Sequence, residues 1–447
     1  MLEPAYQADV VVVGAGIAGL AAAHRLTSAG VTTAVLEAAH DVGGRMSTEK
    51  VDGFRLDRIG QLMSTSYPEL RLTPGLDALA LSTFAPGVLL HSDGRHHRVG
   101  APAPQGGARG ALHAARALAS APRPASAPRA PLGTAVDQAR LAAALARLAG
   151  TPVERLLARP ESTASRSLTT RGLPARTADG FLRPLLSALL CDPELTASSR
   201  CADLALHSFA SGRLCVPEGG AEALPHLLAR SLPAGTVHTG VRVTSVSTTS
   251  VTTAEHGVFR CRAVLLATGA RTAAELLPGL RVPDFHPVTV VHHTTDEPPT
   301  TGAALLLDAD RGGPVAHTAV VSAVDPTRAP AGRALVSSTI LGTPPADLDT
   351  AVRTHLARLY GTPTARWETL AVHHTPDAVP SMRPPHDPHR PVRLLAGLYV
   401  CGDHRDTSTV QGALHSAHRA ARSLLTDLGA AGSLHRAEPV ATEARAA

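Results

Sequence analysis

The sequence predicts an α/β protein in which a parallel sheet, assembled from three separate segments, stands beside a domain of mixed sheet and helices. Three observations support this prediction. An apolar strand runs directly into a glycine-rich turn and a helix at residues 10–26. Strands followed by turns recur at residues 265–270 and 397–403, and helical and strand-rich stretches separate these segments. The length of 447 residues fits two or three lobes, since single cores rarely grow beyond about 250–300 residues.

The first segment is VVVVGAGIAGLAAAHRL, from Val10 to Leu26. Four valines in a row are typical of a strand that is buried on both faces. Gly14, Gly16 and Gly19 permit a tight turn, a close approach of backbone to a ligand, and close packing of helix on strand. The free N–H groups at the start of the following helix point into this turn. The segment therefore predicts a cradle for a pyrophosphate.

A carboxylate follows at the expected place. The next predicted strand, TTAVLEA, carries Glu37 near its end. A carboxylate about 20 residues beyond the glycines can accept hydrogen bonds from ribose hydroxyls. A plain surface glutamate is the alternative, and this position alone does not separate FAD from a nicotinamide dinucleotide.

The segment DVGGRMS then adds Gly43, Gly44 and Arg45, which can bring an arginine and backbone amides to a second face of a diphosphate. With these residues the chain resembles the FAD-dependent oxidoreductases of the flavin amine oxidase and phytoene desaturase-like superfamily. The resemblance continues through GFRLDRIGQLM, GVRVTSV, LLATGA and GLYVCGDHRDTSTVQGALHSAHRAA. It implies a Rossmann-like FAD-binding domain built from three sequence segments, with FAD bound without a covalent bond.

The resemblance also implies individual roles. The backbone near Val243 would contact the adenine, and Gly402 with Asp403 would hold the ribityl chain or a phosphate. The start of the last helix would face the flavin, where its dipole stabilises negative charge on the ring. The residues implied there are Val410, Gly412 and Ala413.

The chain departs from the amine-oxidising branch of that superfamily. That branch generally keeps a lysine near the flavin and two aromatic side chains beside the amine, whereas Lys50 is the only lysine here. Thr409 stands where one aromatic would be, and Cys401 directly precedes Gly402 rather than lying upstream, where some relatives attach flavin. We therefore expect hydride removal from a small, apolar substrate, by C–C desaturation or atypical C–N oxidation. An amine oxidase proper and a flavin-dependent isomerase are the alternatives.

No catalytic residue can be assigned from the sequence. Histidine titrates near neutrality and can act as a base, so several histidines are candidates, although most of the 23 histidines are expected to be packing or surface residues. The candidates are His292, His293 and His404, with Arg58 and Gln61 as further residues of the cavity. His373, His374, His415 and His418 also lie near the motifs. No metal site is expected, because no set of ligands stands at a recognised spacing.

The predicted domain boundaries follow these motifs. Residues 1–75, 231–280 and 391–430 would form the FAD-binding domain. Residues 76–230 would form a helical substrate region that contains a Pro/Ala/Arg-rich insert at 101–133, residues 281–390 the sheet of the substrate domain, and residues 431–447 a flexible tail.

Composition limits the partners. A net charge of +5 without a basic stripe argues against a nucleic-acid partner, and no run is long and apolar enough for an integral membrane segment. Five widely spaced cysteines fit reduced thiols in a cytoplasm. The expected partners are a small-molecule substrate and, as electron acceptor, O2 or an electron carrier. A homodimer is left open. A scaffold protein with a decayed site and a nicotinamide-only dehydrogenase are weaker alternatives, since the flavin motifs are intact.

Overall fold

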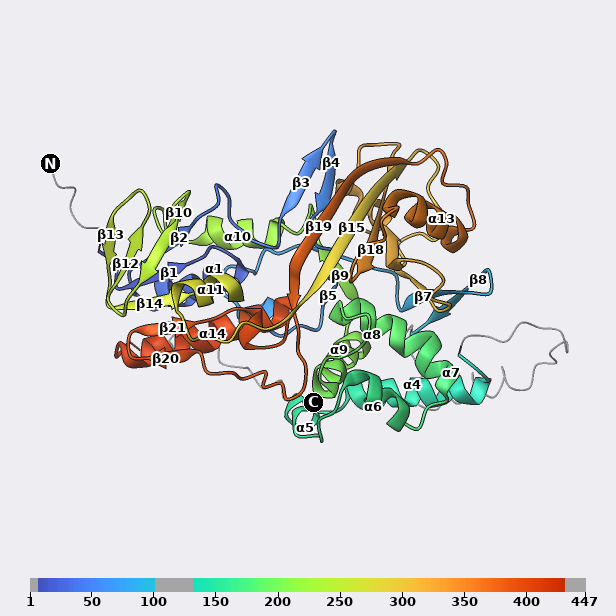
Figure 1. The fold of residues 1–447 in the computed structure, drawn as a ribbon, viewed down its shortest axis with the longest axis horizontal. Helices are drawn as coiled ribbons and strands as arrows, with labels where there is room; N and C mark the ends of the chain where they lie inside the picture. The colour runs from blue at the N-terminus through green and yellow to red at the C-terminus, as the bar shows by residue number, and fades with distance from the viewer. Residues whose placement is uncertain (1–6, 101–131, 431–447) are drawn as a thin grey trace, which may run out of the picture.

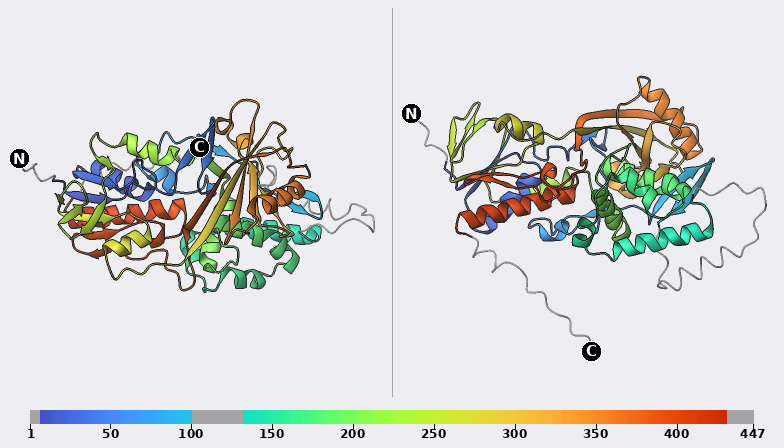
Figure 2. Two further views of the ribbon diagram at one scale, coloured as in Figure 1. Left: turned by 45° about the horizontal axis from the view of Figure 1, so that its top comes forward. Right: turned by 60° about the horizontal axis from the view of Figure 1, so that its bottom comes forward.

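The structure is a computed structural model, and it describes residues 7–100 and 132–430. Two lobes lie side by side (Figures 1 and 2). One lobe contains the predicted parallel sheet. The other contains a larger, mostly antiparallel sheet with a group of helices packed below it in the view of Figure 1. The chain is thus a mixed α/β protein.

The first lobe is built on a six-stranded sheet in the order β10-β2-β1-β14-β21-β20. Only β20 runs antiparallel to its neighbour. The strands come from distant parts of the chain: β1 (Val10–Val13), β2 (Thr33–Glu37), β10 (Val237–Thr239), β14 (Ala263–Leu266), β20 (Arg393–Leu395) and β21 (Leu398–Val400). A small antiparallel sheet of β11 (Val243–Val246), β12 (Ser250–Thr253) and β13 (Val258–Arg260) lies beside it.

The four valines of β1 show how the sequence produces this layer. Val10 and Val12 join the core formed with α1 (Ile17–Ser28), α10 (Ala223–Ser231) and α14 (Val410–Asp427). Val11 and Val13 join the core on the opposite face, with Val251 and Phe259 of the small sheet. The strand is therefore buried on both faces, as the continuous apolar run predicts. The short helix α11 (Ala270–Leu276) follows β14.

The second lobe is built on a seven-stranded sheet in the order β19-β15-β18-β17-β16-β7-β8. Its strands are β7 (Val88–Ser92), β8 (Arg95–Val99), β15 (Phe285–Thr295), β16 (Leu306–Asp308), β17 (Val315–Val320), β18 (Ala334–Leu341) and β19 (Glu368–Pro380). All neighbours are antiparallel except β16 and β7. Smaller sheets join β3 (Thr48–Val51) to β4 (Phe54–Asp57), and β5 (Met63–Ser64) to β9 (Leu214–Pro217) and β6 (Leu81–Thr83).

Helices complete the second lobe. The stretch predicted to be helical contains α4 (Ala135–Ala149), α5 (Val153–Leu157), α6 (Ala164–Thr170), α7 (Ala175–Thr177), η1 (Ala178–Leu182), α8 (Arg183–Leu190) and α9 (Ser199–Ser211). Their apolar faces form one core with β7 and β16. Outside that group lie α2 (Glu69–Leu72), α12 (Val321–Val324), η2 (Pro326–Arg328), α13 (Leu348–Tyr360) and η3 (Asp403–Arg405).

Two local expectations need correction. The apolar segment AHTAVVSAV, residues 316–324, has the composition of a strand throughout, but β17 ends at Val320 and Val321–Val324 is helical. The Ser322 hydroxyl there accepts the Leu335 N–H, which ties this helix to β18. Within the helical stretch, β9 forms a strand because its flanking glycines, Gly212 and Gly219, interrupt the helices.

Some predictions fall outside the described residues. These are the predicted tail, residues 431–447, and all of the predicted insert except Leu132 and Gly133. Among the described residues, no helix combines the length and the apolar character that crossing a bilayer requires.

Candidate active site

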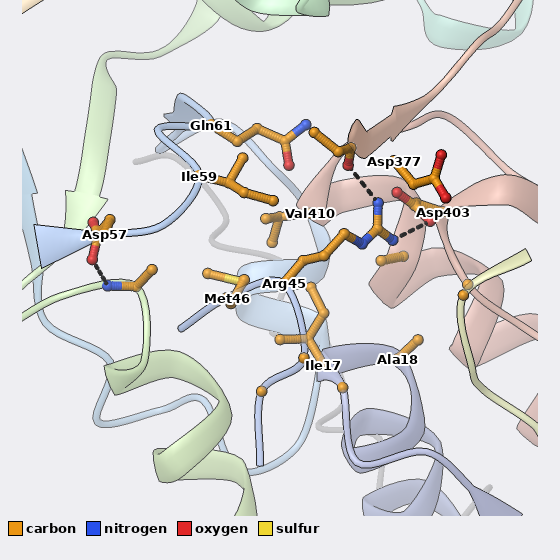
Figure 3. A pocket seen from close by; sticks show the side chains of 18 of the residues that line it. Ile17, Ala18, Arg45, Met46, Asp57, Ile59, Gln61, Asp377, Asp403 and Val410 are labelled. Atoms are coloured by element: carbon orange, nitrogen blue, oxygen red, sulfur yellow. Dashed lines mark hydrogen bonds and ion pairs between the residues drawn. The ribbon is translucent and has the colours of Figure 1, made fainter. Parts of the chain in front are cut away.

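A large cavity of about 650 Å³ runs between the two lobes. One end is lined by the glycine turn after β1, and the other by strands of the second sheet. Figure 3 shows part of its wall, where Arg45 extends toward Asp403 and Ile17 and Ala18 lie nearby on α1. Its size falls in the range of small-molecule and cofactor sites, about 300–1,000 Å³.

Glycine stands at the three positions of the first turn for different structural reasons. Gly14 has a φ of +104°, and its N–H donates to the Leu36 carbonyl at 2.8 Å. A Cβ at Gly19 would lie 2.0 Å from the Gly14 carbonyl oxygen, so Gly19 lets α1 start directly against the turn. A Cβ at Gly16 would meet nothing within 4 Å. Gly14 and Gly16 line the cavity and Gly19 does not. The turn is therefore an open cradle held in shape by Gly19.

Glu37 lies beside this turn and also lines the cavity. One carboxylate oxygen accepts the Ala15 N–H at 2.7 Å and the other accepts the Ala39 N–H at 2.9 Å. The carboxylate is thus fixed at the carboxyl end of β2. Val243, for which the family resemblance implies a contact with the adenine, lines the same cavity.

Arg45 bridges the two ends of the chain. Its guanidinium donates to Asp403 at 2.6 Å and to the Ala378 carbonyl at 2.8 Å (Figure 3). Gly43 and Gly44 precede it with φ values of +111° and +57°, which favour glycine. Four of these five residues belong to the motifs identified in the sequence, Ala378 being the exception, and all five line the cavity.

The start of α14 forms another part of the wall. The Thr409 hydroxyl accepts the Gly412 N–H at 3.1 Å and so caps the helix. Gly402, Val410 and Ala413 line the cavity. Gly412 does not, because it packs tightly against Thr407, whose carbonyl oxygen would lie 1.9 Å from an added Cβ.

The second end of the cavity is mostly apolar. Its walls come from the loop after β4, from β5, β9, β15, β17, β18 and α12, and from the residues next to β6 and β16. The apolar residues there are Ile59, Leu62, Met63, Phe84, Val216, Val290, Leu305, Ala319 and Val321. Polar side chains interrupt this surface at Gln61, His292, His317, Ser337 and Thr339. Gln61 donates to the Ser408 carbonyl at 2.9 Å.

His292 has both ring nitrogens engaged. Its Nε2 lies 3.0 Å from the Asp57 carbonyl oxygen and must donate to it, so Nδ1 accepts the Ser337 hydroxyl at 2.8 Å. Burial lowers the pKa of His292 to about 4. The ring is therefore neutral at pH 7 with a defined tautomer.

His317 differs from His292 in one respect that matters for chemistry. Burial likewise lowers its pKa to about 4, but its Nδ1 has no hydrogen-bond partner among the described residues. His317 is not among the residues that the sequence predicts for the site. In the structure, His317, Ala319 and Val321 alternate along the chain and all line the cavity, a placement that depends on how the strands pair.

The carboxylates of the cavity are engaged or exposed. Asp57 forms an ion pair with Arg328 and also accepts the Thr48 hydroxyl and the Ala221 N–H. Asp403 pairs with Arg45, and Asp377 pairs with Arg271. Glu275, on α11, is exposed. No carboxylate without a partner lines the apolar end, as far as the described residues show.

Several sequence candidates lie elsewhere. His293 is buried on the other side of β15, where its ring packs 5.9 Å from that of Trp367. Arg58 points away and pairs with Glu49. His404 is buried behind Gly402 and does not line the cavity. Of the five candidates, the structure therefore brings only His292 and Gln61 to the cavity.

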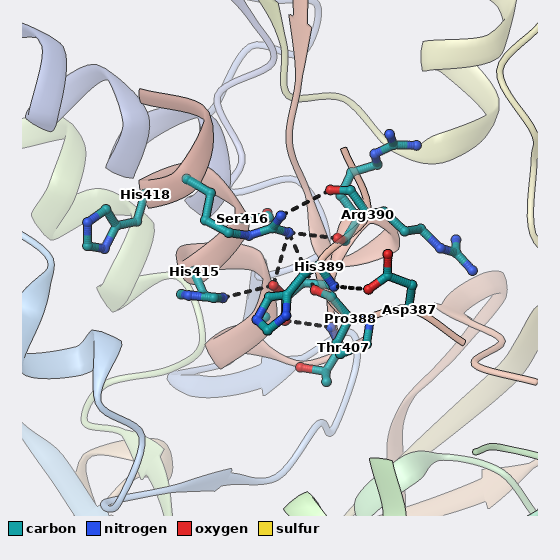
Figure 4. Close-up of polar contacts among 12 residues, drawn as sticks. Asp387, Pro388, His389, Arg390, Thr407, His415, Ser416 and His418 are labelled. Carbon is teal, nitrogen blue, oxygen red and sulfur yellow. Dashed lines mark hydrogen bonds and ion pairs between the residues drawn. The ribbon is translucent and has the colours of Figure 1, made fainter. Parts of the chain in front are cut away.

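The four other histidines that lie near the motifs have structural partners. His373 pairs with Glu49, and His374 with the Thr289 hydroxyl. Figure 4 shows His415 beside the loop at Asp387–Arg390, where Asp406 accepts from His415 at 2.9 Å and from Arg419 at 3.2 Å. His418 contacts Glu69 instead. These contacts hold the surrounding loop against α14. His415 and His418 thus contact different carboxylates.

Comparisons with known proteins agree with this geometry. The family described as flavin containing amine oxidoreductase matches residues 17–425. Putrescine oxidase of Kocuria rosea is 46% identical over 100 residues, which is 21% of this chain and 20% of that protein. Carotenoid 3,4-desaturase of Haloarcula japonica is 53% identical over 49 residues, 11% of this chain and 10% of that protein. The matched segments thus span a fifth or less of these curated relatives.

The fold itself is shared over a much greater length. An oxidoreductase from Methanosarcina mazei superimposes with a TM-score of 0.69 and 17% identity. The superposition covers 92% of this chain and 99% of the other. This likeness establishes the architecture.

Proposed function

The chain belongs to the flavin-containing amine oxidoreductase family and is an FAD-dependent oxidoreductase, and we propose that it removes a hydride from a neutral, largely apolar substrate. The observation that carries this proposal is the division of one cavity into a polar, glycine-lined end and an apolar end with neutral histidines. The sequence pattern, the matched family and the cavity support it together.

The polar end fits FAD. Gly16 leaves open space where backbone N–H groups can meet a diphosphate, and the fixed carboxylate of Glu37 suits ribose hydroxyls. We assign the region of Asp403, Val410 and Ala413 to the flavin and ribityl parts. When bound, FAD supplies the ring that accepts the hydride. In this proposal residues 1–75, 231–280 and 391–430 form a Rossmann-like domain that holds it.

The attachment of FAD is proposed to be non-covalent. None of the described residues that line the cavity is a cysteine. Cys401 is fully buried, and burial raises the pKa of its thiol to about 12. Such a thiol is protonated at neutral pH and a poor nucleophile.

The apolar end favours a neutral substrate. Binding a protonated amine away from water requires a compensating carboxylate or aromatic faces. The carboxylates here already have partners. Among the described residues, the phenylalanines that line the cavity are Phe84 and Phe285, and the Arg271 guanidinium already lies over the Phe285 ring. Lys50 pairs with Glu222 and does not line the cavity. We therefore favour dehydrogenation of a C–C bond, or of a C–N bond in an uncharged substrate. The local identity to putrescine oxidase supports ordinary amine oxidation as the second candidate.

His317 is the residue that we assign to substrate contact. A neutral ring with an unpartnered nitrogen can accept a hydrogen bond or a proton from the substrate. His292 instead holds Ser337 in place, since both of its nitrogens are already bonded.

The first experiment is an absorption spectrum of the purified protein before and after heat denaturation and filtration. Flavin bands that pass into the filtrate are expected for non-covalent FAD. The holoenzyme is then mixed anaerobically with neutral compounds bearing a saturated bond beside a conjugated system, and separately with primary amines. Bleaching by the neutral compounds is expected. Bleaching by amines alone would overturn the substrate proposal, and turnover without bleaching or electron acceptor would indicate an isomerase.

A further inference from the structure

A second group of polar residues lies in the second lobe, away from the cavity. β7 and β16 are parallel neighbours, and their register places His91 opposite Asp308. Asp310 follows two residues later in the chain. One potential ligand atom from each of His91, Asp308 and Asp310 lies within 4.8 Å of the others. Sheet pairing therefore brings together donors that no local spacing in the sequence joins.

His91 is the unusual member of this group. It is 2% exposed, and neither ring nitrogen has a hydrogen-bond partner among the described residues. Its Nδ1 lies 3.6 Å from an Asp308 oxygen and 3.9 Å from an Asp310 oxygen. These separations are too long for hydrogen bonds. A buried polar group without a partner costs free energy, so the nitrogen is expected to have a ligand.

We propose that His91, Asp308 and Asp310 bind a divalent transition-metal ion, with Zn²⁺ as the best match. Ligands at about 2.0–2.1 Å from a tetrahedral Zn²⁺ are about 3.3–3.4 Å apart, close to the separations found here. One imidazole and two carboxylates form a donor set that suits Zn²⁺. The Asp310 side chain is 38% exposed, which gives the ion a path from solvent and leaves room for water as a further ligand.

The surrounding contacts orient the donors. One Asp308 oxygen accepts from Gly312 N–H at 2.7 Å, His355 Nε2 at 2.9 Å and Arg358 at 3.1 Å. The other oxygen faces His91 and, within the described part of the chain, accepts only the Asp310 N–H at 3.1 Å. His355 is fixed in turn, because its Nδ1 accepts the Val315 N–H. Hydrogen bonds of this kind hold metal-binding carboxylates in position.

Asp310 and the local charge are also consistent with a cation. Asp310 accepts the Ser92 hydroxyl at 2.8 Å on one oxygen and the Asp93 N–H at 2.9 Å on the other. The two carboxylates carry two negative charges, whereas Arg358 is the one arginine that the described contacts place on them. A bound ion would neutralise the excess and join β7, β16 and the following loop.

The test uses the full-length protein, treated with EDTA, dialysed and titrated with Zn²⁺ by calorimetry. Zinc retained after gel filtration is measured in the same samples. Asp310→Asn removes a donor at a partly exposed position without changing side-chain volume, and His91→Phe removes the imidazole. Asp296→Asn is the control, because Asp296 is an exposed carboxylate paired with Arg366 at 3.7 Å.

We expect about one Zn²⁺ per chain in the wild type and the control, and at least tenfold weaker binding in both site variants. Far-UV circular dichroism and flavin content of each sample verify that the variants are folded. Equal binding by wild type and Asp310→Asn would assign the zinc to surface histidines and overturn the proposal. Absence of stoichiometric binding to the wild type would overturn it as well. Neither result bears on the flavin site.

Discussion

The Glu37 side chain both shapes the cofactor end of the cavity and supplies a negative charge there. Its two oxygens accept the Ala15 and Ala39 N–H groups, and it lines the cavity. Glu37→Gln puts an N–H donor against one of these backbone donors and removes the negative charge. A hydrogen bond to a charged group contributes about 1.5–3 kcal/mol, so FAD affinity should fall about 10- to 100-fold. Fluorescence titration of the apoprotein with FAD measures this, and Glu368→Gln, at an exposed position, should leave it unchanged.

His317 should affect turnover rather than cofactor binding. His317→Leu removes the unpartnered Nδ1 and keeps the site apolar, so kcat/KM should fall about 10- to 100-fold, as for a lost buried hydrogen bond. His317→Asn restores an acceptor near Nδ1 and should recover part of the activity. Because burial lowers the pKa of His317 to about 4, its protonation should limit the rate only near that pH. Equal activity of the Leu and Asn variants, with FAD retained, would show that His317 only fills space.

At the scale of the element, the turn between β1 and α1 contains one glycine that matters for binding the cofactor and another that matters for folding. Gly16 has a φ of −69° and open space around it, so alanine fits its backbone but projects into the cavity. Gly19 has no such space, since a Cβ would lie 2.0 Å from the Gly14 carbonyl oxygen. Gly16→Ala should therefore keep the apoprotein's melting temperature and weaken FAD binding at least tenfold. Gly19→Ala should lower the melting temperature itself, by several degrees or more.

Differential scanning calorimetry of apoprotein, paired with FAD titration, separates the two effects. Gly150→Ala serves as the control, because Gly150 ends α4 with a φ of −85° and an added Cβ would make only ordinary contacts. If Gly16→Ala destabilised the apoprotein as much as Gly19→Ala, the distinction between an open cradle and a packing glycine would fail.

For the whole molecule, local motifs predicted more of the cofactor end than of the substrate end. The glycine turn, Glu37 and Arg45 follow one another within the first part of the chain, so their pattern is visible in the sequence. The substrate end depends on pairing between β15, β17 and β18, which decides whether a histidine faces the cavity. His292 and His293 are adjacent in sequence, yet strand alternation places them on opposite faces. His317 was missed because nothing local distinguishes it from other strand histidines.

The buried strand histidines His292, His293 and His317 all make the folded state less stable at acidic pH. Burial lowers the pKa of His293 to about 4, and nearby Arg353 lowers it further while Asp349 raises it. An unfolded histidine titrates near 6.5. Above that pH both states are neutral. As the pH falls from 6.5 to 4, this histidine binds a proton in the unfolded chain but not in the folded chain. The free energy of unfolding therefore falls. His292 and His317, with similar pKa values, act in the same direction.

His293→Phe tests this at a position outside the cavity. The phenyl ring can pack against Trp367 and does not titrate. Both His293 nitrogens lack hydrogen-bond partners among the described residues. Relative to wild type, the variant should gain about 2–3 kcal/mol of unfolding free energy at pH 4.5 and change little at pH 7.5. Urea unfolding at both pH values measures the difference. His256→Phe, at an exposed position, is the control substitution. An equal effect of His293→Phe at both pH values would assign the gain to packing alone and exclude the protonation argument.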